Sequence, residues 1–512
     1  MAASGAGLVA DEADGEDAVR EGSAAGGRAL GQRGLRGDTQ VWPRAEAVPG
    51  ASRRVVRQVL RVVELDALPM PPGAGTVFAG RRFLVVDDGC GVALELAGML
   101  ERQGAQVRTP RDVDGDCDGL IHLAALRPGA AGVLPQAYDG IRRALDGGLR
   151  WLVVASGAGG RFGWRFDGGG IGDPAPGAGL RGLARAVAQE YPEVLVRALD
   201  VDTKDTPRAV AQRFMAELLD AEAPVVVGHE GDLRRGISVV PAELHGEPVV
   251  PLGPDGVVLL TGGARGATAR VALELARTSG CHVEVMGRTP EPAGEPAFPD
   301  VPDEAGLRRA LVAKGQSGEI EATIRRILAD REIRRNLEAL REHAASVRYH
   351  AGDVRSPHVV REIVGRVQAR RGRLDGVVHG AGLAEDRLVR DKTPESFERV
   401  YRTKVDGACA LAQAVRPDIG FFVVLGGIAG VHAGRGQSDR AAAADACGTL
   451  AHAWRTRLRG RVLVAHFGPW ARGPKWATGD AGLIEPDAGA AALLREIAHG
   501  DEAQVVFTGA AR

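Results

Sequence analysis

The chain has 512 residues, of which 45% are hydrophobic and 26% are charged, and 65 basic against 66 acidic side chains leave a formal net charge of −1. This balance is ordinary for a soluble protein of about two to four domains, and it offers no charge excess for binding nucleic acid or an anionic membrane surface. The five cysteines are scattered and form no C-x-x-C pair, which excludes a disulfide scaffold and a zinc ribbon and favours a reducing cytoplasm. No metal site is expected. No apolar run reaches the length of about 18 residues that a transmembrane helix needs.

Residues 1–52 are predicted to form a disordered tail. The first 50 residues include ten glycines and eleven alanines and almost no large apolar side chains. Such a segment cannot bury enough surface to offset its chain entropy. Its acidic start also differs from a signal peptide, which needs a basic region followed by an apolar one. The run of β-branched residues at 53–63 predicts one or two short strands entering the folded body.

Between residues 53 and 250, short apolar segments alternate with helical patterns. The expected strands are 83–86, 119–126, 151–156 and 194–201, and the expected helices are 92–103 and 179–190. Uninterrupted apolar strands separated by helices indicate a parallel sheet covered on both faces.

The same pattern then repeats. Strands are expected at 257–260, 283–288, 347–350, 376–383 and 462–465, and residues 421–430 correspond to 151–160, a strand that ends in a glycine-rich turn. G-V-V-H-G-A-G-L at 376–383 matches G-L-I-H-L-A-A-L at 119–126. The predicted fold is therefore α/β, with two tandem Rossmann-like, doubly wound parallel-sheet subdomains at 53–250 and 251–512.

A glycine-rich loop, T-G-G-A-R-G-A-T, follows the apolar strand 257–260 and precedes a helix expected at 269–278. Glycines let the backbone turn sharply and approach a pyrophosphate at a helix N-terminus, where free N–H groups and the dipole favour anions. The alternative is a glycine turn without a ligand. The candidate cofactor-binding residues in the loop are Thr261, Gly262, Gly263, Arg265 and Gly266. The first half has no such loop.

The end of the next strand predicts which dinucleotide is bound. An acidic residue there suits the ribose 2′-hydroxyl of NAD, whereas Arg288, together with Arg265, suits the 2′-phosphate of NADP(H). The alternative is two ordinary solvated arginines. Further candidates are Asp353 and Val354 at the adenine edge, and His379, Gly380, Ala381 and Gly382 beside the adenosine ribose.

Residues 289–345 form a long insertion between two of these strands. Isoleucine and leucine recur at roughly helical spacing from residue 319 to 345, with arginine and glutamate between them, so one or two amphipathic helices are expected. Their apolar faces either pack locally on the body or form a surface for a partner.

The motifs together resemble the ketoreductase region of type I polyketide synthases, within the short-chain dehydrogenase/reductase superfamily. They are T-G-G-A-R-G-A-T, V-V-H-G-A-G-L, T-K-V-D-G, I-A-G, G-Q-S-D and F-G-P-W, in that order. With the helical insertion, the chain is most similar to the ketoreductases of polyunsaturated fatty acid synthases and related iterative polyketide synthases. The resemblance implies a structural first half without nucleotide, and a second half that reduces a β-ketone on an acyl thioester with NADPH. It also places Pro469 and Trp470 on the nicotinamide side and a substrate lid at 471–483.

The resemblance further implies four catalytic positions, and three of them are substituted. Lys404 matches the family's lysine, but the serine, tyrosine and asparagine positions hold Gly427, Arg440 and Ala444. A slip of alignment does not explain this, because no tyrosine follows residue 401 and the only serine beyond it is Ser438. A positioned general acid contributes about 10²- to 10⁴-fold in rate, so the loss is severe.

Three hypotheses follow. The chain is a degenerate ketoreductase that keeps NADP(H) binding and serves as a structural or docking part of a synthase, or it is an active reductase with non-standard donors, or it is a scaffold that binds no nucleotide. Lys404, Asp439 and His432 are the candidate substitute donors. The glycine loop with Arg265 and Arg288 argues against the third hypothesis. Expected partners are an acyl-carrier-bound β-ketoacyl thioester or other synthase domains.

Overall fold

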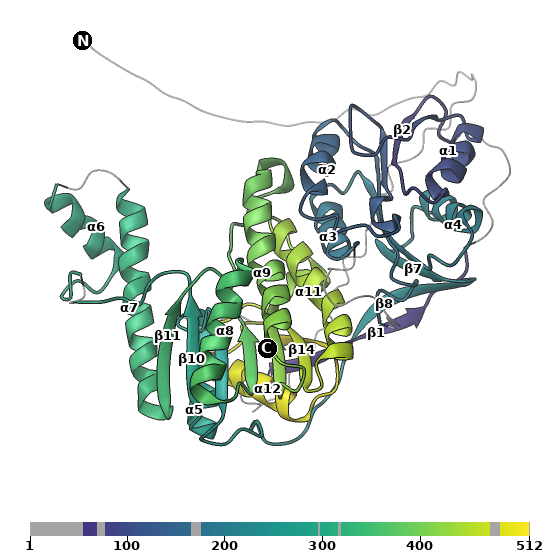
Figure 1. Cartoon of the computed structure of the whole chain (residues 1–512). Coiled ribbons are helices and arrows are strands. Elements are labelled where there is room, and N and C mark those ends of the chain that lie inside the picture. The colour runs from purple at the N-terminus through teal and green to yellow at the C-terminus, as the bar shows by residue number, and fades with distance from the viewer. Residues whose placement is uncertain are drawn as a thin grey trace, which may run out of the picture. The chain divides into compact units, whose positions relative to one another are not determined.

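Strands from both halves of the chain join into one mostly parallel, 15-stranded sheet in the computed structural model (Figure 1). The structure describes residues 55–68, 77–164, 176–294, 297–315, 319–471 and 482–510. The strand order in this part of the chain is β11-β10-β9-β12-β13-β14-β15-β1-β8-β7-β6-β5-β4-β2-β3. The predicted α/β fold with two Rossmann-like halves is confirmed.

The elements of the first half extend to residue 241. They are β1 (Val55–Glu64), β2 (Arg82–Val86), α1 (Val92–Arg102), β3 (Gln106–Arg108), β4 (Gly119–His122), η1 (Ala124–Leu126), α2 (Ala137–Asp146), β5 (Trp151–Ser156), α3 (Leu180–Glu190), β6 (Leu195–Val201), α4 (Pro207–Leu219), β7 (Val226–Glu230) and β8 (Leu233–Pro241).

The elements of the second half begin at residue 257. They are β9 (Val257–Thr261), α5 (Gly266–Ser279), β10 (His282–Gly287), α6 (Glu304–Ala313), α7 (Ile320–His343), β11 (Ser346–Ala351), α8 (Pro357–Arg371), β12 (Gly376–His379), η2 (Val389–Asp391), α9 (Pro394–Ala414), β13 (Phe421–Gly427), α10 (Ala429–His432), α11 (Ser438–Arg457), β14 (Arg461–Phe467), α12 (Pro486–His499) and β15 (Gln504–Gly509).

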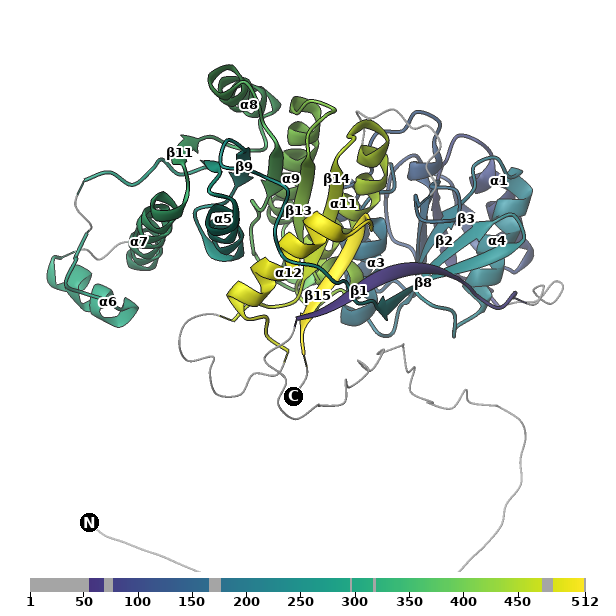
Figure 2. The ribbon, with the colours of Figure 1, turned by 90° about the horizontal axis from the view of Figure 1, so that it is seen from below.

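The long strand β1 joins the two halves of the sheet. It pairs antiparallel with β15 over Val55–Val59 and antiparallel with β8 over Gln58–Glu64. Figure 2 shows it as a purple strand that passes from β15 to β8. The described part of the expected strand region, Val55–Glu64, is thus a single strand that pairs with both halves, and the sheet has no break between them.

Helices α3 and α11 pack against each other across the same junction. Gly182 lies so close to α11 that a Cβ there would be 2.2 Å from the carbonyl oxygen of Ala441. Beside this crossing, Arg181 donates to the Asp445 carboxylate at 3.0 Å and to the Thr449 hydroxyl at 2.7 Å. One hydrophobic cluster runs through strands β4–β6 of the first half and helices α9 and α11 of the second.

Several expected strands end earlier than their apolar letters suggest. The expected strand 119–126 ends at His122 and continues as the short helix η1, and the expected strand 376–383 ends at His379. In the segment 421–430 the strand ends at Gly427 and the short helix α10 follows where a glycine-rich turn was expected. The pairing registers of β4 and β12 end at His122 and His379, and that of β13 with β14 ends at Gly427.

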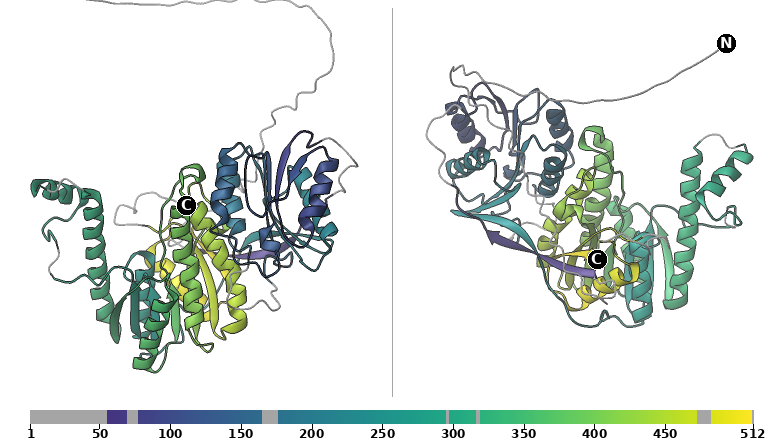
Figure 3. Two further views of the ribbon diagram at one scale, coloured as in Figure 1. Left: turned by 45° about the horizontal axis from the view of Figure 1, so that its top comes forward. Right: turned by 180° about the vertical axis from the view of Figure 1, so that it is seen from behind.

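The insertion forms two helices, α6 and α7. Apolar side chains of α7 at its C-terminal half, Ile333, Leu337 and Leu340, join the core under the sheet, which supports local packing for this part. The N-terminal half of α7 shares a separate small core with α6. Both views of Figure 3 show the two helices, in teal green, standing out from the sheet.

The predicted tail at 1–52 lies outside the described residues, as does most of the expected lid at 471–483. Within the described part of the chain, no helix combines the length and the apolar character needed to cross a bilayer. The same residues include no group of three or more histidine, cysteine, aspartate or glutamate side chains arranged to hold a metal ion.

Candidate functional site

The glycine loop lies where the sequence predicts it, between β9 and α5. All five residues of β9 are buried, between β10 on one side and β12 on the other, so the loop leaves the centre of the sheet. Gly262 has a φ of +73°, and a Cβ there would be 3.0 Å from the Ala381 nitrogen. Gly266 has a φ of +59° and opens α5, and the position of its missing Cβ has no neighbouring atom within 4 Å.

These features fit a dinucleotide. The backbone at Gly262 passes close to the loop after β12, and Gly266, whose Cβ position is open, begins a 14-residue helix whose N-terminus favours an anion. Gly263 is also close-packed, because a Cβ there would be 2.8 Å from the Cβ of Leu260. The helix begins three residues before the expected position 269, so the loop is shorter than the glycine pattern suggests.

His379 supports the loop from below. Its ring is fully buried, its Nδ1 lies 2.7 Å from the Thr261 hydroxyl, and its Nε2 lies 3.0 Å from the Lys404 carbonyl oxygen. Burial lowers the pKa of His379 well below its ordinary value, so the ring stays neutral. Since both ring nitrogens have partners within the protein, His379 positions Thr261 and α9 and has no nitrogen left for a ribose.

The three residues that follow His379 line the loop. The missing side chain of Gly380 makes room for α5, because a Cβ there would be 2.0 Å from Thr268 Oγ1. The Ala381 N–H donates to the Thr261 hydroxyl at 3.3 Å. A Cβ at Gly382 would be 3.5 Å from Lys404 Nζ, which places Gly382 between the loop and the lysine.

The two arginines predicted for the 2′-phosphate have different surroundings. Arg288 is exposed directly after β10. Arg265 donates from Nε to Glu332 Oε2 at 3.2 Å, and the Gly266 N–H donates to Glu332 Oε1 at 2.9 Å. Glu332 belongs to α7 of the insertion. It was not predicted as a site residue, because it is one of many acidic residues along an amphipathic helix and no motif marks it.

Asp353 and Val354 follow β11 at the same edge of the sheet as the glycine loop. Asp353 accepts hydrogen bonds from the Arg355 guanidinium, the nearest at 2.6 Å, and these bonds lower the pKa of the carboxyl. Val354 is buried. Asp353 therefore already has a cationic partner.

Of the four predicted catalytic positions, Gly427 and Arg440 are neighbours, and Lys404 contacts the strand that carries Gly427. Lys404 Nζ donates to the Leu425 carbonyl oxygen at 3.0 Å, two residues before Gly427. The nearest atom to a Cβ placed on Gly427 is Arg440 Nη2, at 4.0 Å. Position 427, where the family has serine, therefore has room for a side chain. Ala444 lies on α11 one turn after Arg440 and is buried against α10. A Cβ placed on Gly430 of α10 would be 2.6 Å from the Cβ of Ala444.

The side chains in this group have unusual electrostatics. Burial lowers the pKa of Lys404 to about 8, and the positive charge of Arg440 acts in the same direction. Arg440 Nη1 donates to both carboxylate oxygens of Asp386, at 3.0 and 3.1 Å. Asp386 was not predicted, and no motif in the sequence marks it.

The other candidate donors are occupied or inaccessible. Asp439 forms a fully buried ion pair with Lys392 at 2.5 Å. Burial lowers the pKa of His432 to about 4, so this side chain is neutral near pH 7. Ser438, the last serine of the chain, is also fully buried.

Pro469 and Trp470 follow β14. Pro469 is exposed, and the Trp470 ring packs against Phe467 with 5.0 Å between ring centroids. Trp470 also forms a bridge with Ile484, which closes the base of the segment that the structure does not describe. This placement is at the same carboxyl edge of the sheet as Gly427, because β13 and β14 are parallel neighbours.

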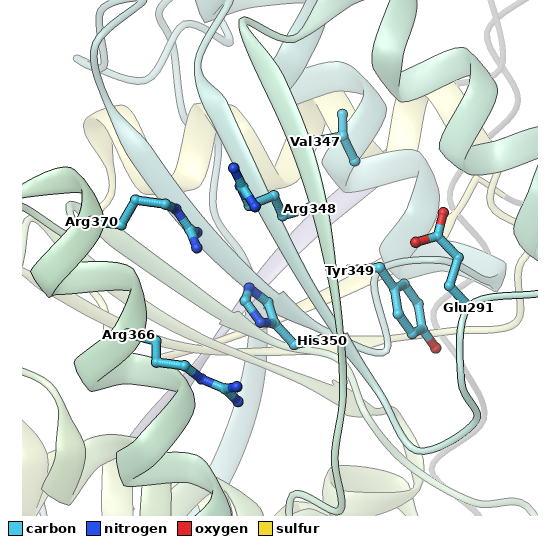
Figure 4. Close-up of a pocket in the computed structure, with 7 residues that line it drawn as sticks. All are labelled: Glu291, Val347, Arg348, Tyr349, His350, Arg366 and Arg370. Carbon is cyan, nitrogen blue, oxygen red and sulfur yellow. The ribbon is translucent and has the colours of Figure 1, made fainter.

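A hollow of about 400 Å³ lies elsewhere, at the edge strand β11 (Figure 4). It is lined by Glu291, Val347, Arg348, Tyr349, His350, Arg366 and Arg370. None of these residues was predicted as a site residue. Its polar wall is held by the buried Glu284, which pairs with His350 at 2.7 Å and with Arg370 at 2.6 Å.

Residues 256–472 match the family model for the KR domain, that is, the ketoreductase domain that the sequence motifs resemble. This part of the chain is therefore similar to KR domains. The match covers the glycine loop, the insertion and all four predicted catalytic positions. It ends just after Trp470.

Curated relatives contain a similar KR region within much longer chains. A polyunsaturated fatty acid synthase subunit from Thraustochytrium sp. is 28% identical over 324 residues, which are 60% of this chain and 11% of that protein. A phenolphthiocerol/phthiocerol polyketide synthase subunit from Mycobacterium tuberculosis is 26% identical over 319 residues, 60% of this chain and 15% of that protein. The chain thus spans only a small part of these relatives.

Solved ketoreductase structures share the fold of nearly the whole described chain. A-type ketoreductases from a modular polyketide synthase superpose with a TM-score of 0.66 at 19% identity, over 89% of this chain and 93% of that one. A ketoreductase domain from the bacillaene assembly line gives 0.62 at 18% identity, over 90% and 97%. At these identities the likeness concerns the fold, including the first half, which precedes the region matched by the KR model.

Proposed function

We propose that this KR domain binds NADP(H) and does not reduce a ketone, and that it serves as a structural or docking part of a fatty acid or polyketide synthase. The observation that carries the proposal is the geometry at Gly427 and Arg440. Neither position carries a hydroxyl group: Arg440 is the nearest side chain to the space at Gly427, and Lys404 binds the Leu425 carbonyl oxygen two residues before Gly427.

The cofactor would be held by the glycine loop and by the backbone at Gly380–Gly382. Arg265 and Arg288 supply positive charge for phosphate groups, and Pro469 and Trp470 lie toward the nicotinamide end. Bound NADPH would supply a hydride to a carbonyl carbon. The chain would have to supply a proton to the carbonyl oxygen and a second hydrogen bond to hold it.

Neither contribution has an evident source at positions 427 and 440. Gly427 offers no donor, and Arg440 is a poor acid because a guanidinium keeps its proton to about pH 12 or above. Loss of a general acid alone lowers the rate about 10²- to 10⁴-fold. The two losses together leave a reduction too slow to matter beside a full ketoreductase, although members of one site are not additive.

One observation favours a second function, an active reductase with a non-standard donor. The pKa of Lys404, lowered to about 8, makes its ammonium group a far better proton donor near neutral pH than an ordinary lysine. In this alternative Lys404 replaces the missing tyrosine and Arg440 holds the ketone oxygen. The product would be a β-hydroxyacyl thioester.

The partners follow from the proposal. The named relatives are subunits of multidomain synthases, so the KR domain is expected to act beside other synthase domains. A tethered β-ketoacyl thioester on an acyl carrier is the substrate in the alternative function. In the main proposal the β-ketoacyl thioester on that carrier is not reduced by this domain.

The test uses the full chain with NADPH and a short β-ketoacyl thioester. Calorimetry measures NADPH binding, and absorbance at the reduced nicotinamide band measures consumption. Binding without consumption supports the main proposal. Consumption that yields the hydroxyacyl product and is lost in Lys404→Ala establishes the alternative, and absence of binding rejects both.

A further inference from the structure

The insertion helix α7 holds the glycine loop by two side chains one helical turn apart. Asn336 donates from Nδ2 to the Ala264 carbonyl oxygen at 2.8 Å. Glu332 accepts the Gly266 N–H at 2.9 Å and the Arg265 Nε–H at 3.2 Å. Residues four apart on a helix share a face, so a single face of α7 grips the loop on both sides of Arg265.

These contacts of Glu332 and Asn336 with the loop do not depend on α6 or on the N-terminal half of α7. Ile333, Leu337 and Leu340 bury the same stretch of α7 in the core that includes α5. Glu332 is therefore brought to the loop by a packed helix. Its side chain is still one-third exposed and that of Arg265 is 57% exposed, so the contact can open to solvent without unpacking α7.

The Glu332 carboxylate uses donors that a phosphate would use. The Gly266 N–H stands at the N-terminus of α5, where the helix dipole and unsatisfied N–H groups favour an anion. Arg265 adds a full positive charge. A nucleotide phosphate at this point would meet a second anion within a few ångströms, and like charges at that distance repel each other.

We propose that Glu332 is a built-in competitor for the nucleotide phosphate, and that the insertion uses it to set the affinity of the KR domain for NADP(H). The proposal rests on the NADP(H) binding proposed above. Phosphate entry requires the Glu332 side chain to release Gly266 and Arg265. Asn336 keeps the loop attached to α7 while that exchange takes place.

The charge is tested by Glu332→Gln in the full chain. Glutamine keeps the length and one acceptor oxygen but removes the negative charge. Calorimetry with NADPH is expected to give an affinity about three- to tenfold tighter than that of the unmodified chain, and the gain is expected to shrink at high salt because the charge is partly exposed. The matched control is Glu338→Gln, an exposed glutamate six residues further along α7 with the same change of charge. This control is expected to leave the affinity unchanged.

The grip is tested separately by Asn336→Ala, which loosens the loop without changing its charge. If the gain in Glu332→Gln came from a looser loop, Asn336→Ala would give the same gain. We expect Asn336→Ala to give equal or weaker binding. A gain of similar size in Asn336→Ala or in Glu338→Gln overturns the proposal.

The remaining outcomes are also decisive. Unchanged or weaker NADPH binding in Glu332→Gln, with measurable binding in the unmodified chain, overturns competition while leaving the proposed function intact. Binding by none of the four proteins rejects the proposed function itself, and the competition with it. Binding that becomes measurable only in Glu332→Gln supports both.

Discussion

Arg440 is tied to Asp386 by two hydrogen bonds from one guanidinium nitrogen, at 3.0 and 3.1 Å, and so stands beside the open position at Gly427. The contact with Asp386 holds the Arg440 guanidinium at the position where the resemblance implies a tyrosine hydroxyl. Both side chains of the pair are partly exposed, so the pair adds little to stability. Replacement of Arg440 is therefore expected to leave the fold intact, which makes the site open to repair.

The first prediction is that Gly427→Ser together with Arg440→Tyr creates ketone reduction. The space at Gly427 accepts a serine, and Lys404 is already in place beside it. Ala444 is left unchanged because it is buried against α10. With a short β-ketoacyl thioester, NADPH consumption should rise at least about 10²-fold over the unmodified chain, the lower end of a general acid's contribution.

The control for this repair is Gly427→Ser with Arg440→Phe. It has the same ring but no hydroxyl, so it should bind NADPH and give no gain in rate. If the serine–tyrosine variant binds NADPH and is no faster than this control, the residues around Lys404 do not form the reductase site.

The second prediction concerns Lys404 and pH. Its pKa is about 8 in the folded chain and has the ordinary value of 10.5 in the unfolded chain, so between these two values the unfolded chain binds more protons. Stability from this group therefore rises as pH increases from about 8 to 10.5, and the buried charge is a cost at pH 7. Lys404→Met should raise the free energy of unfolding at pH 7 by up to about 3 kcal/mol and lose that advantage near pH 10.

Urea denaturation at pH 7 and pH 10 measures this difference. The matched control is Lys204→Met, since Lys204 is exposed and its replacement should shift stability equally at both pH values. An advantage of Lys404→Met that does not depend on pH would show that better packing, and not removal of a buried charge, is its cause.

The third prediction uses the close approach of Gly380 to Thr268. A Cβ at Gly380 would be 2.0 Å from the threonine Oγ1 and 2.8 Å from its Cβ, so Gly380→Ala must push α5 away from the sheet. Overpacking of this kind costs about 1–3 kcal/mol. The melting temperature should fall, and NADPH binding should weaken because the loop moves with α5.

A second change should rescue that variant. Thr268→Gly removes the opposing side chain, so Gly380→Ala with Thr268→Gly should recover most of the stability, less about 1 kcal/mol for glycine in a helix. Thr268→Gly alone measures that helix cost. A double variant no more stable than Gly380→Ala would mean that another contact causes the strain.

The local pattern of the sequence predicted those parts of the fold that are made by neighbours in the chain. The order of β9, loop, α5 and β10 follows from an apolar run, glycines and helical spacing, and the structure has it with shifts of a few residues. The glycines that a positive φ or a close approach requires, Gly262, Gly266 and Gly380, were also among the predicted residues.

Features that depend on distant pairing were missed. The pairing of β1 with both β15 and β8 joins residues more than 170 positions apart, and no local periodicity encodes it. Glu332 and Asp386 act through a partner from another element, so their roles appear only when the helices are placed. The buried threonine and the backbone carbonyl that hold the His379 ring also lie on other segments, so its role in supporting the loop does not follow from the local sequence.

The last prediction concerns the ion pair that joins the two halves. Arg181 and Asp445 are 10% and 5% exposed, and Arg181 also donates to Thr449 and to the Phe162 carbonyl. Asp445→Asn leaves this arginine buried without its charge partner, and breaking a buried pair from one side costs about 3–5 kcal/mol.

The control is Glu398→Gln, which breaks the exposed pair with Arg402 and should cost about 0.5 kcal/mol or less. Urea denaturation should also show whether the two halves unfold together. If the ion pair couples them, Asp445→Asn should lower the midpoint of one unfolding transition that both halves share. If Asp445→Asn lowers stability no more than Glu398→Gln, the junction of α3 and α11 is held by its close-packed backbone at Gly182, and the ion pair contributes nothing to it.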